Sequence, residues 1–137
     1  MNATDLVRQF EGCRLTAYQD GAGVWTIGWG HTGKEVYAGL IWTQVQADEA
    51  RVHDIAEAQA LLLRYSPAII DPGALAALTD FVFNLGSGNY RTSTLCTLVN
   101  ADNWPAAKVE ILKWDHSNGV VIPGLRLRRQ AEAALLP

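Results

Sequence analysis

Hydrophobic residues near the start of the chain recur with the spacing of a helix. Leu6, Val7 and Phe10 fall on one face of a helix that this spacing predicts over residues 3–11. Gly12 follows directly, and glycine is typical of the position just past the end of a helix. The chain is therefore expected to begin its fold with one short amphipathic helix.

The period of the pattern then changes from that of a helix to that of strands. Residues 17–31 alternate as a strand, a glycine-rich turn at 20–23 and a second strand over 24–30. A short third strand is expected at 36–37. These segments predict a small sheet in the N-terminal part of the chain.

Helical spacing returns after residue 42 and continues to the end of the chain. Thr43 and Gln46 form a capping-box sequence, and Asp71 stands before Pro72 in the favoured order of cap and first helical residue. Helices are expected over residues 43–64, 72–85, 94–100, 103–114 and 124–136. A small sheet followed by a run of helices indicates an α+β protein with five or six helices.

Composition and charge narrow the class of protein. The chain has 137 residues, of which 49% are hydrophobic, so one domain with a real core is expected. The net charge of −3 does not suggest a nucleic-acid-binding protein, which would normally carry a basic stripe. The sequence holds neither an apolar signal-peptide core nor 18 consecutive apolar residues, so no stable membrane insertion is expected. Cys13 and Cys96 lack metal-site spacing and are expected to be two buried thiols.

One carboxyl group stands before the predicted hairpin and another stands in its turn, in different local settings. Glu11 stands at the C-terminal end of the first helix, where the helix dipole and apolar neighbours favour a protonated carboxyl group, whereas a nearby arginine would oppose them. Asp20 stands in a polar turn and is expected to be ionised. One proton donor and one carboxylate are what a glycosidase requires. An ordinary helix end beside an ordinary Asp-Gly turn remains the structural alternative.

The second predicted strand has one bulky face and one small face. Side chains alternate between the faces of a strand, so Thr26, Gly28 and Gly30 share the small face. That face is expected to leave room for a flat polar ligand, with Thr26 placed to orient a water molecule. The glycines could equally mark only bulges.

Glu11, Asp20 and Thr26 stand in the segment EGCRLTAYQDGAGVWTIGWGHT. It closely resembles the pattern E-G-x-x-L-x-A-Y-x-D-x-x-G-x-x-T-I-G-x-G-H-T of the phage-type lysozymes, glycoside hydrolase family 24. The segments ALTDFVFNLGSGNYRTSTL and GVVIPGLRLRRQAE resemble two further blocks of that family, in the same order. The likeness covers nearly the whole chain.

The resemblance implies a muramidase that acts as an endolysin and cleaves the β-1,4 bond between N-acetylmuramic acid and N-acetylglucosamine. It implies Glu11 as the general acid, Asp20 as the carboxylate across the sugar and Thr26 as a residue that holds the attacking water. It also implies a lysozyme-like α+β fold in one domain, residues 1–137. A sheet lobe with the long helix (about 12–60) and a helical lobe (1–11 and 61–137) would enclose the cleft.

Other residues are assigned more general parts. Asn84 and Ser87 follow a predicted helix end, where they could contact the sugar or cap the helix. The resemblance implies that Arg128 or Arg129 reaches back to Glu11. His31 is expected to make a structural hydrogen bond, and no metal or other cofactor is expected. Phe81, Phe83 and Trp114 are expected in the core.

Two positions depart from the family pattern. Trp29 stands where family members carry a smaller residue, and Asp80 stands where a small residue is common. Neither change touches the three residues implied in catalysis.

The sequence leaves two other functions open. A lytic transglycosylase would use the hydroxyl of the muramic acid in place of water, and a non-catalytic module would only bind peptidoglycan. For a hydrolase that inverts the sugar configuration, the two carboxyl groups are expected to lie about 6.5–9.5 Å apart. The expected partner is the glycan strand, bound by a monomer that waits in the host cytoplasm. A holin would then release it to the periplasm and the cell wall.

Overall fold

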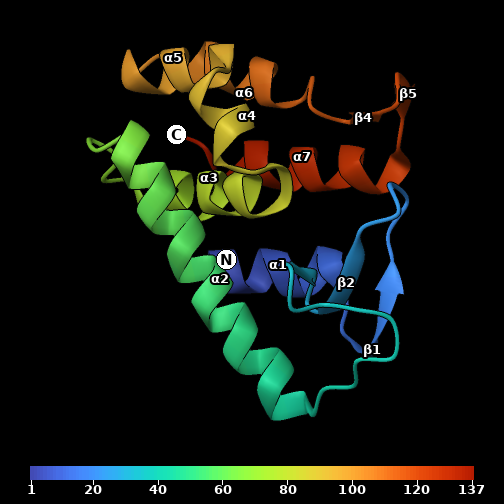
Figure 1. Ribbon diagram of the computed structural model, residues 1–137. Helices are drawn as coiled ribbons and strands as arrows, with labels where there is room; N and C mark the ends of the chain where they lie inside the picture. The colour runs from blue at the N-terminus through green and yellow to red at the C-terminus, as the bar shows by residue number, and fades with distance from the viewer.

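The computed structural model describes residues 1–137 as an α+β fold, which confirms the predicted fold class. A small sheet lies at one end of the molecule and a group of helices at the other (Figure 1). The first helix, α1 (Ala3–Glu11), packs against helices near the other end of the chain, α3 (Pro72–Leu85) and α7 (Pro123–Leu135). Glu11, the last residue of α1, is thereby brought beside residues of α7.

The sheet is built from three antiparallel strands. They are β1 (Arg14–Gln19), β2 (Trp25–Gly28) and β3 (His31–Thr32), in the order β1-β2-β3. The prediction of a strand at 36–37 was wrong. Val36 is buried, and its amide donates to the carbonyl of Gly33, which closes a turn directly after the true third strand.

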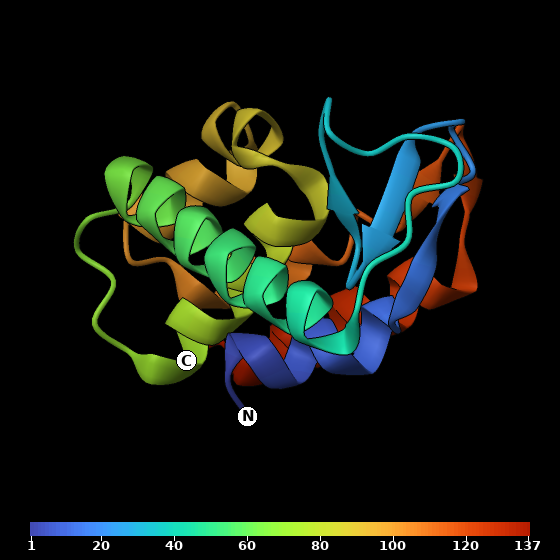
Figure 2. The same cartoon turned by 60° about the horizontal axis from the view of Figure 1, so that its bottom comes forward.

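Helix α2 (Gln44–Tyr65) runs from the sheet to the helical group, as Figure 2 shows. It begins at the predicted capping box, in which Thr43 and Gln46 each bond the other's backbone amide. Trp29 joins the sheet to this helix: its indole Nε1 donates to Asp48 Oδ1 at 2.9 Å, and Arg51 lies over its ring. The unusual tryptophan therefore packs on α2.

The helical group encloses the larger core. Besides α3 and α7 it contains α4 (Ser87–Arg91), α5 (Thr94–Asn100) and α6 (Trp104–Ile111). Phe81 is fully buried and meets the rings of Tyr90 and Trp114 edge-on. This confirms Phe81 as a core aromatic, whereas Trp114 and Phe83 are half-buried and pack against that core. Phe83 also lines a cleft.

Several details were not predicted. Helix α4 is extra, and a small hairpin of β4 (His116–Ser117) and β5 (Val120–Val121) follows α6, which ends earlier than expected. Cys96 is buried as predicted, but the prediction was wrong for Cys13, which is only half-buried; both thiols are free. None of the helices is both long and apolar enough to cross a membrane.

Candidate active site

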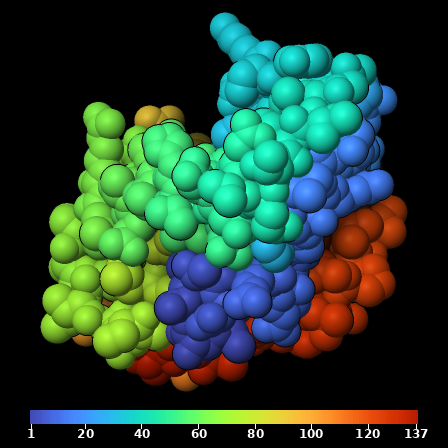
Figure 3. Space-filling view, turned by 90° about the horizontal axis from the view of Figure 1, so that it is seen from below, coloured from blue at the N-terminus to red at the C-terminus, as the bar shows by residue number.

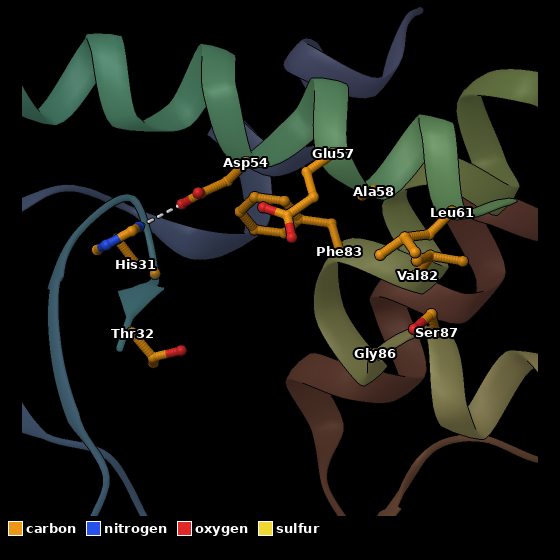
Figure 4. Close-up of a pocket in the computed structure, with 11 residues that line it drawn as sticks. His31, Thr32, Asp54, Glu57, Ala58, Leu61, Val82, Phe83, Gly86 and Ser87 are labelled. Atoms are coloured by element: carbon orange, nitrogen blue, oxygen red, sulfur yellow. Dashed lines mark hydrogen bonds and ion pairs between the residues drawn. The ribbon is translucent and has the colours of Figure 1, made fainter. Parts of the chain in front are cut away.

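A cleft of about 350 Å³ separates the sheet from the helices. The surface is notched between the loop after β3 and helix α2 in Figure 3. The close-up in Figure 4 shows β3 on one side and helices α2, α3 and α4 on the other. The lining residues are Gly30, His31, Thr32, Asp54, Glu57, Ala58, Leu61, Val82, Phe83, Gly86 and Ser87. The cleft is therefore lined by residues from both the sheet and the helices.

Glu11 lies directly behind the wall of this cleft. A Cβ atom added to Gly30 would lie 2.6 Å from Glu11 Oε2, so only glycine leaves room for the carboxyl group there. The other oxygen, Oε1, accepts a hydrogen bond of 2.6 Å from Nη1 of Arg128. The Glu11 side chain is 19% exposed, so it is neither sealed in nor freely mobile.

Arg128 is a buried cation with two carboxylate partners. Its Nε and Nη2 atoms donate to the two oxygens of Asp80, each at 2.8 Å, while Nη1 serves Glu11. Burial alone lowers the pKa of Arg128, but Asp80 and then Glu11 raise it by more, so the net pKa is raised. The guanidinium is therefore a fixed positive charge beside Glu11, which confirms the predicted contact for Arg128.

Asp20 is held by the turn that it begins. Its Oδ1 accepts from the amides of Ala22 and Val24 at 2.8 and 2.9 Å. Both bonds use the same oxygen, so Oδ2 makes no hydrogen bond within the protein. The side chain that sequence reasoning assigned to chemistry thus also closes the turn between β1 and β2.

Thr26 is connected to Asp20 through one residue. The Thr26 hydroxyl donates to the carbonyl of Val24 at 3.0 Å, and the amide of Val24 donates to Asp20. The Thr26 hydroxyl oxygen keeps its acceptor capacity for a water molecule. Neither Asp20 nor Thr26 lines the 350 Å³ cleft itself, but Thr26 pairs across the sheet with Thr32, which does.

Tyr18 lies within the electrostatic reach of both acids. Burial and then the negative charge of Glu11 raise the pKa of its phenol, and Asp20 adds a smaller effect in the same direction. The two acids therefore act on a common neighbour, which pairs with Thr26 across β1 and β2.

Gly28 and Gly30 were both expected to leave space for a ligand, but only Gly30 lines the cleft. Gly28 is buried, and a Cβ atom there would lie 3.1 Å from the ring of Trp42. The expectation for Gly28 is therefore corrected: its missing side chain makes room for Trp42 and Ala47.

The structure also gives different places to Asn84, Ser87 and Arg129. Ser87 lines the cleft, as proposed for a sugar contact, whereas Asn84 does not. The Asn84 Oδ1 atom is turned inward and accepts from Arg129 Nη2 at 2.8 Å. Arg129 also donates to the buried carboxyl group of Glu132 and has no bond to Glu11.

His31 makes the structural contacts that were predicted. Its Nδ1 lies 2.6 Å from Asp54 Oδ2, and its Nε2 lies 2.6 Å from Glu35 Oε1. Partial burial lowers the pKa of the ring, but the hydrogen bonds to Asp54 and Glu35 raise it by more, so the pKa of His31 is raised. The contact with Asp54, drawn in Figure 4, joins β3 to α2 across one end of the cleft.

Sequence reasoning missed the face that α2 turns to the cleft. Asp54, Glu57, Ala58 and Leu61 recur at helical spacing on one face, a signal that was present but reads as an ordinary amphipathic pattern. His53, Asp54 and Glu57 have ligand-type atoms within 4.8 Å of one another. Asp54 is already bonded to His31, and His53 lies 3.8 Å from Glu57, so each has a partner without an ion.

The fold consists of a small sheet and a helical lobe that are joined by a connecting helix, with a cleft between them. The partly buried carboxyl group of Glu11 lies behind the wall of this cleft. This arrangement defines a lysozyme-like enzyme. The family description "Phage lysozyme" matches residues 8–132. An endolysin of Acyrthosiphon pisum secondary endosymbiont phage 1 is 40% identical over 134 residues, which cover 95% of this chain and 91% of that protein.

Two further similar proteins support the same family. A SAR-endolysin of Enterobacteria phage PA-2 is 33% identical over 122 residues, covering 89% of this chain and 74% of that protein. The muramidase domain of SpmX from Asticaccaulis excentricus superposes with a TM-score of 0.86 at 28% identity, covering 97% of this chain and 92% of that one. The chain belongs to the phage lysozyme family, and it is a lysozyme, an enzyme that degrades bacterial peptidoglycan.

Proposed function

We propose that this lysozyme hydrolyses the β-1,4 bond between N-acetylmuramic acid and N-acetylglucosamine with Glu11 as general acid. The observation that carries the proposal is the place of Glu11 Oε2 against Gly30, a residue of the cleft wall. Because Oε1 is occupied by Arg128, the proton that Glu11 transfers is carried by Oε2. That proton passes to the glycosidic oxygen as its bond to the anomeric carbon breaks.

Asp20 and Thr26 supply the other half of the reaction. The free Oδ2 of Asp20 and the acceptor oxygen of Thr26 together can hold and deprotonate a water molecule, whose oxygen forms the new bond to the anomeric carbon. A water between the sugar and Asp20 gives inversion of configuration and requires carboxyl groups about 6.5–9.5 Å apart. The anomer released from a soluble glycan, read by proton NMR within the first turnover, tests this step.

The first test is the turbidity of chloroform-treated Gram-negative cells with the wild type and Glu11→Gln. The substitution keeps shape and polarity but removes the transferable proton, so clearing is expected to slow by about 10²-fold or more. Glu49→Gln, an exposed glutamate of α2, is the matched control and is expected to clear like the wild type. Equal clearing by Glu11→Gln would overturn the assignment of the acid.

Two outcomes would favour the other functions. Anhydro sugars at the new chain ends, in place of free reducing ends, would identify a lytic transglycosylase. Binding to cell walls without any clearing by the wild type would identify a non-catalytic module. The connection of Asp20 to Thr26 through Val24 favours hydrolysis, because it prepares a place for water.

We also propose that the enzyme acts as a monomer and without a metal, and that it passes from the host cytoplasm to the periplasm through a membrane opened by a holin. The similarity to an endolysin along nearly the whole chain supports this route. Expression in a Gram-negative host with and without a co-expressed holin tests it. Lysis only with the holin is expected, and lysis by the enzyme alone would contradict the route.

A further inference from the structure

The guanidinium of Arg128 is divided between two acids from different helices. Asp80, on α3, accepts from Nε and Nη2, and this leaves Nη1 for Glu11 at the end of α1. Asp80 is fully buried and the Arg128 side chain is 4% exposed, so water does not compete for these bonds. The planar guanidinium cannot turn while two of its nitrogens are bound to one carboxylate.

Glu11 needs an external restraint of this kind. It is the last residue of α1, and Gly12 behind it leaves the helix with a φ of +67°. Its carboxyl group has no hydrogen bond other than the one from Arg128. The direction in which Oε2 points is therefore determined by the atom that holds Oε1, together with the space that Gly30 leaves.

We propose that Asp80 is a positioning residue of this enzyme, which acts on Glu11 through Arg128; the proposal rests on the function above, in which Glu11 is the acid. With Asp80 in place, Arg128 offers Glu11 a single N–H, and Oε2 stays free for the substrate. Without the Asp80 carboxylate, the buried guanidinium has Glu11 as its remaining carboxylate partner and turns to bind both of its oxygens. That geometry withdraws Oε2 from the glycosidic oxygen.

The neighbouring acid of α7, Glu132, has no hydrogen bond to Arg128 and pairs with the other arginine. Glu132 is also buried, but its Oε1 accepts from Arg129 Nη2 at 2.7 Å. Burial and its interaction with Asp80 raise the pKa of Glu132 well above the usual value. Each of the two adjacent arginines of α7 therefore has its own acid, and only Arg128 is connected to the cleft.

The test compares Asp80→Asn with Asp115→Asn on soluble, uncross-linked glycan strands, with new reducing ends as the signal. Asp115 is a suitable control because it is also buried and also pairs with an arginine of α7, at 3.7 Å from Arg126 Nε. Asp80→Asn is expected to lower kcat about tenfold to hundredfold with KM within about twofold of wild type, as expected for a misdirected catalytic group. Asp115→Asn is expected to retain kcat.

The outcomes separate this proposal from the proposed function. If Glu11→Gln remains active, the assignment of the acid fails. If Glu11→Gln is inactive while Asp80→Asn has wild-type kcat, only the positioning by Asp80 is overturned. Equal losses of kcat in Asp80→Asn and Asp115→Asn would also overturn it, because they would reflect a general loss of stability.

A second variant covers the case in which Asp80→Asn does not fold. Arg128→Lys keeps the charge but cannot bind two carboxylates in the same fixed plane. It is expected to show the same fall of kcat at nearly constant KM, with folding verified by circular dichroism. Wild-type kcat in folded Arg128→Lys would show that the divided guanidinium is not needed.

Discussion

At the scale of single residues, the contact between Gly30 and Glu11 can be tested directly. Gly30 has a φ of +86°, and an alanine Cβ would lie 2.6 Å from Glu11 Oε2. Gly30→Ala must therefore push the carboxyl group out of its place, and kcat is expected to fall about tenfold or more. The left-handed backbone adds a stability loss of about 1–2 kcal/mol, measured by thermal unfolding.

Gly39→Ala separates the two effects. Gly39 has a φ of +89°, but nothing lies within 4 Å of the position of its Cβ. The same backbone strain is expected to lower stability by a similar amount while kcat stays at the wild-type value. A loss of kcat in Gly39→Ala as large as that in Gly30→Ala would contradict a specific contact with Glu11.

The same residues show how far the sequence allows the site to be predicted. Glu11 and Asp20 could be singled out because a helix end and a tight turn are local features. The burial of Gly28 could not be predicted, because the ring of Trp42 that covers it comes from a residue outside the sheet. Likewise, spacing alone does not reveal that Arg128 meets a residue 117 positions earlier; that expectation depended on the family resemblance.

At the scale of secondary-structure elements, His31 connects β3 with α2 through Asp54. Its raised pKa means that folding stabilises the protonated ring. The contribution of His31 to the free energy of unfolding is therefore fully present below the unfolded pKa of about 6.5, provided that the carboxylates are ionised. It is lost as pH rises through the higher pKa of the folded state. The contact is expected to hold the sheet against α2 most firmly in mildly acidic solution.

His31→Gln removes this pH-dependent contribution. At pH 5.5 the variant is expected to be less stable than the wild type by about 1–2 kcal/mol, and the difference should shrink at pH 9. Urea unfolding at the two pH values measures it. His53→Gln, which changes a largely exposed histidine of α2, should show no comparable pH dependence. A difference for His31→Gln that grows with pH would contradict the sign.

The elements themselves were predictable where their ends carry local signals. Helices α2 and α3 begin at the caps that the sequence indicates, Thr43 and Asp71. Helix α4 has five residues and no side-chain cap, so neither its length nor its composition predicts a helix. The strand predicted at 36–37 was wrong because Val36 is apolar, as strand residues are, but it is buried from a turn.

At the scale of the whole molecule, the chain passes between the lobes instead of completing one before the other. Helix α1 lies on α3 and α7, the sheet follows it, and α2 then contacts both β2 and α3. Figure 2 shows both ends of the chain on the side of the helical lobe. Glu11 and Arg128 close this path with an ion pair between the first and the last helix. We therefore propose that residues 1–137 form a single folding unit.

A single unit predicts one cooperative unfolding transition. Trp25, Trp29 and Trp42 lie in or beside the sheet, so a variant with Trp104→Phe and Trp114→Phe reports the sheet lobe by fluorescence. Its midpoint is expected to coincide with that of the helices in far-ultraviolet circular dichroism, with equal calorimetric and van't Hoff enthalpies. An earlier transition of the sheet alone would instead show that the lobes unfold separately. Coincident transitions would mean that the pairing of Glu11 with Arg128 is gained and lost together with the fold, because both partners depend on helices at opposite ends of the chain.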